Sequence, residues 1–135
     1  MDVFCAPIET IDEIWKKVSP YFQRALDKYN PEYSLQDLNG LVKTGQWKLF
    51  VAVNDDLKIV GGAIVSFIMY PKSYVAFVTC IGGKHFTNEQ YFIKFIELLK
   101  QYGADRIQGY VTESIERLYR KVGIFRKTAM VEINI

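Results

Sequence analysis

A glycine pair followed by two basic residues, Gly82-Gly83-Lys84-His85, separates an apolar run from a long amphipathic stretch that begins near Asn88. Glycines that end a strand just before a helix leave backbone N–H groups exposed, and the helix dipole favours an anion there. Tyr119 stands four residues before Gly123, on a neighbouring element. An anion-binding loop near a phenol indicates a group-transfer enzyme that uses a phosphate-bearing cofactor.

Each of these residues also has a purely structural interpretation. The glycine pair can be an ordinary strand-to-helix turn that requires positive φ. A lone histidine such as His85 is more often a surface residue than a phosphate donor or a base. Tyr119 can simply pack beside Leu118.

The elements that must position these residues follow from hydrophobic periodicity and from turn residues. In order, we expect a strand at Val3–Ala6, a helix from Thr10, a helix between Ser34 and Gly45, strands at Trp47–Val53, Leu57–Tyr70 and Tyr74–Ile81, a helix from Asn88 to Tyr102, a strand at Arg106–Thr112, a short helix ending before Gly123, and a final strand. This order predicts an α/β fold with a mixed central sheet flanked by helices, in a single domain.

Several local signals refine these elements. Thr10 with Glu13, and Thr87 with Gln90, predict capping boxes, and Ser34 predicts a further helix cap. Pro20 should kink or divide the first helix near residue 19. Gly61 and Gly62 predict a bulge or a close backbone approach.

Composition excludes several classes of protein. The chain has 135 residues, about enough for one domain, and its net charge of +2 gives no strong nucleic-acid signal. No apolar run is long enough to cross a membrane, and the start resembles no signal peptide. Cys5 and Cys80 lie in separate apolar runs, which indicates reduced core residues of a cytoplasmic protein, and a single histidine predicts no metal site.

The second half of the chain resembles the GNAT superfamily of N-acetyltransferases. Members carry the pattern Asn-x-x-Ala-x-x-Leu-Tyr-x-x-x-Gly-Phe; here Leu118, Tyr119 and Gly123 match it, while Thr112 replaces the Asn, Ile115 the Ala and Ile124 the Phe. The order of elements extends the resemblance over nearly the whole chain. It implies one GNAT-like acetyltransferase domain over residues 1–135.

The resemblance implies the transfer of an acetyl group from acetyl-CoA to an amine, on a small molecule or a protein. Tyr119 would be the general acid for the departing coenzyme A thiolate, since a phenol with an unperturbed pKa of about 10 keeps its proton at pH 7. The main chain of Thr79, Cys80 and Ile81 would pair with the pantetheine arm. Gly82, Gly83, Lys84 and His85 would contact the phosphates. Glu32 and Glu113 are both open as the general base, and a homodimer is compatible with the sequence.

The chain departs from the family at the cofactor loop. The signature Arg/Gln-x-x-Gly-x-Gly/Ala falls on residues 83–88, with Gly83, Phe86 and Asn88 at the positions it specifies. Phe86 could obstruct the pyrophosphate, or the glycine pair could provide the approach one turn earlier. Small GNAT-like proteins of bacteriophages look similar here, which would place the protein in the host cytoplasm. The alternative function is a cofactor-free GNAT-like fold that acts as a binding or virion-associated protein.

Overall fold

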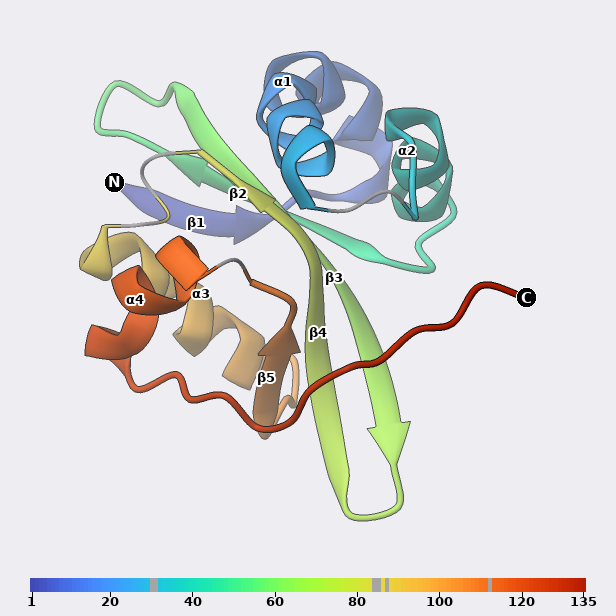
Figure 1. The fold of residues 1–135 in the computed structure, drawn as a ribbon. Helices are drawn as coiled ribbons and strands as arrows, with labels where there is room; N and C mark the ends of the chain where they lie inside the picture. The colour runs from blue at the N-terminus through green and yellow to red at the C-terminus, as the bar shows by residue number, and fades with distance from the viewer. Residues whose placement is uncertain (30–31, 84–85, 87, 112) are drawn as a thin grey trace.

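The computed structural model spans the whole chain and describes all residues except 30–31, 84–85, 87 and 112. The described residues form a five-stranded sheet with helices on both faces (Figure 1). The elements are β1 (Asp2–Cys5), η1 (Ile8–Thr10), α1 (Ile11–Tyr29), α2 (Leu35–Lys43), β2 (Lys48–Val53), β3 (Ile59–Tyr70), β4 (Ser73–Gly82), α3 (Glu89–Gln101), β5 (Arg106–Gly109), α4 (Glu113–Tyr119) and η3 (Arg120–Val122).

The strands lie side by side in the order in which they occur along the chain, from β1 to β5. Neighbours are antiparallel except β4 and β5, which are parallel because α3 connects them as a crossover. Strands β3 and β4 form a long hairpin closed by Pro71 and Lys72, and it projects beyond the other strands (Figure 1). The predicted mixed sheet and its parallel pair are confirmed.

Two apolar cores hold the helices to the sheet. Helices α1 and α2 pack on one face, where Val18, Phe22 and Leu38 are buried. Helix α3 packs on the other face through Phe95 and Leu99, and α4 lies beside it (Figure 1). Packing on both faces explains why most residues of β4 are apolar.

The local signals were partly correct. Ser34 caps α2, with its hydroxyl accepting from the Asp37 backbone N–H at 3.1 Å. Of the two effects predicted for Pro20, a kink or a division, division of the first helix does not occur, since α1 runs unbroken through Pro20. The Thr10 hydroxyl donates to the Pro7 carbonyl at 2.7 Å in the preceding turn, rather than forming the predicted capping box.

The predicted end of the chain differs from the structure. Strand β5 ends at Gly109, whereas the sequence predicted a strand up to residue 112. Residue 112, and residue 87 of the second predicted capping box, lie outside the described residues. The predicted final strand is wrong, because residues 124–135 have no regular secondary structure. An alternating pattern gives a segment the capacity to form a strand, but a strand also needs a partner for its backbone groups.

Candidate functional site

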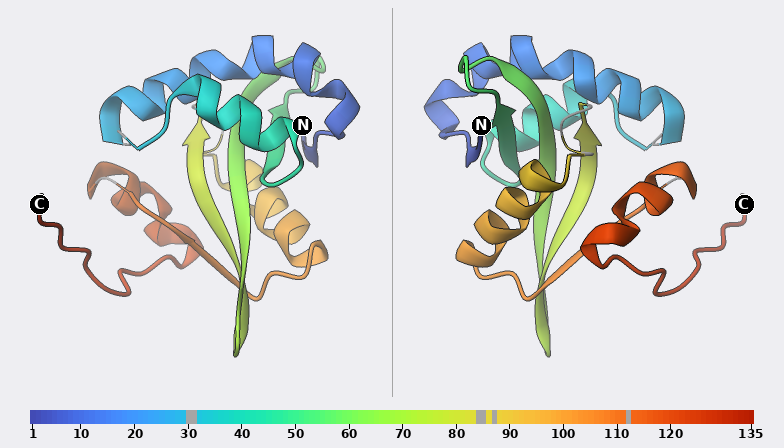
Figure 2. Two further views of the ribbon diagram at one scale, coloured as in Figure 1. Left: turned by 90° about the vertical axis from the view of Figure 1, so that its right-hand side faces the viewer. Right: turned by 90° about the vertical axis from the view of Figure 1, so that its left-hand side faces the viewer.

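Strands β4 and β5 separate at the end where the sequence predicts a ligand. They pair over Val75–Val78 and Arg106–Gly109, while β4 continues to Gly82. Figure 2 shows β5 leaning away from β4 above their shared base. The two parallel strands therefore diverge toward the end of β4.

A β-bulge lies at the point of divergence. Ile64 of β3 is opposite Cys80, whereas the next residue, Val65, is opposite Val78, so Thr79 is the additional residue of the bulge. A bulge bends its strand and redirects its backbone groups. The bulge therefore turns the main chain of β4 immediately after β5 stops pairing with it.

The side chains that follow the bulge point into the protein. Cys80 is 3% exposed, in the core beneath α1, and its thiol donates weakly to the Phe22 carbonyl at 4.0 Å. Burial raises the pKa of the Cys80 thiol to about 12, so the thiol is not a nucleophile at neutral pH. Ile81 packs against the other core. A ligand at this segment would therefore meet main chain, as the resemblance implies, rather than side chains.

Packing within the protein accounts for the glycine pair. A Cβ atom on Gly82 would lie 2.5 Å from the Tyr21 carbonyl oxygen of α1. Gly83 has a φ of +103°, and a Cβ there would lie 2.5 Å from the Val60 carbonyl oxygen and 2.6 Å from the Gly61 Cα. The close approach predicted for Gly61 is thus present, and its partner is the end of β4. The anion-binding role of the pair stays a prediction.

Phe86 and Asn88 are the described residues between Gly83 and α3. The Phe86 backbone N–H donates to the Gly83 carbonyl at 3.2 Å, and the Phe86 ring is 1% exposed and contacts the Phe95 ring. The Phe86 ring therefore points into the core, which disfavours the alternative that it obstructs the pyrophosphate. Asn88 caps α3 by accepting from the Gln90 N–H at 2.8 Å. Lys84 and His85 lie outside the described residues.

Tyr119, the proposed general acid, is joined to this loop. It is the last residue of α4 and is 7% exposed, and its hydroxyl donates to the Phe86 carbonyl at 2.7 Å. Its ring stacks on Phe92 of α3, with centroids 4.4 Å apart. The structure thus brings Tyr119 and the predicted cofactor loop together, as the sequence indicated. The Tyr119 hydroxyl also forms a hydrogen bond that joins α4 to this loop. Its catalytic role stays a prediction.

A buried carboxylate that was not predicted from the sequence, Glu116, lies one helical turn before Tyr119 in α4. Glu116 accepts from Arg126 through both oxygens, at 2.8 and 3.1 Å, and Arg120 lies 3.7 Å away. The hydrogen bond with Arg126 lowers the pKa of Glu116. Arg120 was recognisable as an i+4 partner in the sequence, but Arg126 was not. Glu116 therefore partly neutralises the positive charge of Arg120 and Arg126.

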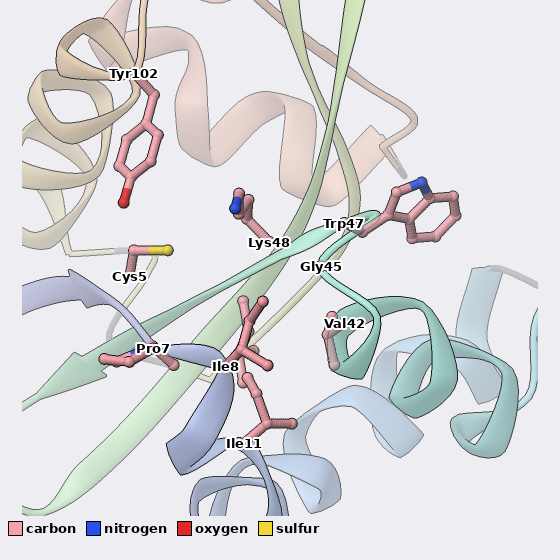
Figure 3. Close-up of a pocket in the computed structure, with 11 residues that line it drawn as sticks. Cys5, Pro7, Ile8, Ile11, Val42, Gly45, Trp47, Lys48 and Tyr102 are labelled. Atoms are coloured by element: carbon pink, nitrogen blue, oxygen red, sulfur yellow. The ribbon is translucent and has the colours of Figure 1, made fainter.

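A separate cavity of about 230 Å³ lies at the opposite edge of the sheet (Figure 3). Ile8, Val42 and Trp47 line it, and Figure 3 shows the hydroxyl of Tyr102 directed toward Cys5. Hydrogen bonding with the Cys5 thiol, together with burial, raises the pKa of Tyr102 to about 12. None of the predicted catalytic or cofactor-binding residues lines this cavity.

Candidate bases and ligands elsewhere give no second site. Glu113 lies in the first turn of α4 and is exposed, as is Glu32. Within the described residues, no group of three acidic, histidine or cysteine side chains could hold a metal ion. No helix in the same part of the chain is long and apolar enough to cross a membrane.

Comparisons with known proteins give one partial sequence match. The sequence model of glycosyltransferase family 92 matches residues 75–134, which is less than half of the chain. This match begins in β4 and omits most of the sheet. No curated protein sequence matches the chain significantly.

Solved structures match over the whole length. A probable acetyltransferase is 14% identical with a TM-score of 0.72, and the match covers 100% of this chain and 97% of that one. An aminoglycoside acetyltransferase from an uncultured soil metagenomic sample, in complex with trehalose, is 12% identical with a TM-score of 0.69, covering 99% and 94%. A ribosomal-protein-alanine N-acetyltransferase from Brucella melitensis biovar Abortus 2308 is 12% identical with a TM-score of 0.69, covering 100% of both chains. The chain therefore has the fold of GNAT-type acetyltransferases.

Proposed function

We propose that this protein is an acetyl-CoA-dependent N-acetyltransferase that acts on an amine. The observation that carries the proposal is the position of the Thr79 bulge, where the pairing between β4 and β5 has just ended. We infer that the bulge directs main-chain groups toward the space between these two diverging strands. The likeness in fold to acetyltransferases supports the same function.

The residues of this segment suit the arm of coenzyme A. An extended arm that carries amides can add to β4 over Thr79–Gly82 as a further strand would. The side chains of Cys80 and Ile81 are packed in the cores, so they would not stand in its way. The phosphates of coenzyme A would bind at the start of α3 and the loop before it, because helix N-termini attract anions. Acetyl-CoA would supply the acetyl group as an activated thioester.

The chain's own groups would then orient the reaction. Main-chain N–H groups near the bulge are suited to polarising a carbonyl oxygen. Tyr119 carries a proton beside the loop, and it must exchange its bond to the Phe86 carbonyl for one to the leaving group before it can act as general acid. The acceptor amine is free to be a small molecule or a protein side chain.

Two observations favour the alternative, a cofactor-free binding protein. The Tyr119 hydroxyl already has a structural partner, and the glycine pair is required by contacts with α1 and β3. Both features would be kept in a protein that has lost the cofactor. Fold alone does not separate the two functions.

Calorimetric titration with acetyl-CoA distinguishes the acetyltransferase from the cofactor-free binding protein. We expect binding, and a gain in unfolding free energy of about 2.7 kcal/mol at a ligand concentration of roughly 100 times the dissociation constant. If the loop binds the phosphates, Lys84→Ala should weaken binding, because it removes a cation from that loop. Lys72→Ala is the matched control, since Lys72 lies in the hairpin turn at the far end of β4. The absence of any binding at millimolar acetyl-CoA would reject the enzyme and leave the binding protein.

A further inference from the structure

The last nine residues of the chain, 127–135, have the sequence pattern of a strand that is apolar on one side. We call this segment the tail. Val131, Ile133 and Ile135 alternate with Glu132 and Asn134. Such alternation is typical of a strand with one buried face. In the structure, however, Val131 is 92% exposed and Ile133 is 85% exposed.

The tail is held at its base and projects from the body. The bonds from Arg126 to Glu116 fix the chain to α4 just before the tail begins. Beyond this point all residues are exposed. Figures 1 and 2 show the chain end pointing away from the sheet and the helices.

Strand β5 presents a free edge of the sheet. It is the last strand in the order β1 to β5, and its described pairing is with β4 alone. Ile107, Tyr110 and Val111 are exposed on or just after it. An edge of this kind, with its outward N–H and C=O groups, is a template for another strand.

We propose that two copies of this chain associate by exchanging tails, so that residues 129–135 of each copy add as a strand to the β5 edge of the other. Each chain has an exposed segment with the sequence pattern of a strand and, at β5, an open edge of its sheet. A two-fold pair satisfies both at once and closes the assembly, because the same contact is made twice. The exposed apolar side chains of the tail and of β5 would then cover each other.

Light scattering during size-exclusion chromatography of the full chain, under reducing conditions, tests the proposal. We expect twice the mass of one chain, and slow hydrogen exchange at the amides of residues 129–135. Ile133→Asp should raise the dimer dissociation constant by about tenfold or more, since it places a charge where the dimer would bury an apolar side chain. Asn134→Asp is the matched control, because it adds the same charge one position along, on the polar side of the strand, and should leave the dimer intact.

The other outcomes contradict tail exchange. A chain that is monomeric at all concentrations, with a protected tail, would mean that the tail pairs with its own β5. A monomer with an unprotected tail would mean that the tail has no strand partner. A dimer that Ile133→Asp and Asn134→Asp affect equally would mean that another surface forms the interface.

Discussion

Replacing Tyr119 by phenylalanine should destabilise the fold, and the size of the loss follows from one bond. The hydroxyl donates to the Phe86 carbonyl at 2.7 Å in a buried position. Phenylalanine removes the donor and leaves that carbonyl without it, which costs about 1–3 kcal/mol for a buried group. The ring can keep its stacking on Phe92, so no cavity of any size is created. We therefore expect a loss of about 1–3 kcal/mol in the free energy of unfolding.

Urea unfolding followed by circular dichroism measures this loss. Tyr110→Phe is the matched control, because Tyr110 is 65% exposed and water can replace any partner of its hydroxyl. It should change the free energy of unfolding by less than about 0.5 kcal/mol. If Tyr119→Phe is equally silent, the bond to Phe86 does not stabilise the protein, and the structural role given to Tyr119 is refuted.

The same variant addresses catalysis once an acceptor amine is known. A general acid contributes about 10²–10⁴-fold to the rate, so turnover by folded Tyr119→Phe should fall in that range. The affinity for acetyl-CoA should change little. A variant that is less stable but fully active would show that Tyr119 only joins α4 to the loop.

Two further substitutions and one reaction test the packing around β4. Gly83→Ala should lower the unfolding free energy by at least about 2 kcal/mol, because its φ is +103° and its Cβ would collide with Val60. The control is Gly40→Ala in α2, where nothing lies within 4 Å of the added Cβ. In thermal melts this variant should raise the unfolding free energy by about 0.5–1 kcal/mol. A thiol reagent near pH 8 should modify Cys5 in the native protein and reach Cys80 only in urea, given the raised pKa and burial of Cys80; rapid native modification of both thiols would contradict this.

The architecture was predictable because its signals are local. The apolar run that became β4, the glycines after it and the periodic stretch that became α3 are contiguous in the sequence, and they fix a parallel crossover. The closeness of Tyr119 to the loop before α3 was also predictable, because α4 comes directly after β5. These relations need no knowledge of contacts between distant segments.

The remaining features depend on such contacts. The ligand-binding role of the glycine pair stays a prediction, while its close contacts with Tyr21 and Gly61 were not predictable, because these residues are far from it in the sequence. The bond between Glu116 and Arg126 spans a turn that no periodicity describes. The final strand was predicted from alternation alone, whereas the formation of a strand depends on a neighbouring edge.

The sequential order of the strands has a consequence for folding kinetics. The β3–β4 hairpin closes through two residues, so it can form within about 1–10 μs and before any distant contact. Strand β1, in contrast, pairs with β2 across the whole of α1 and α2. Closing that larger loop costs more chain entropy, and contacts of high sequence separation slow folding. We therefore expect the hairpin to nucleate folding and β1 to join the sheet last.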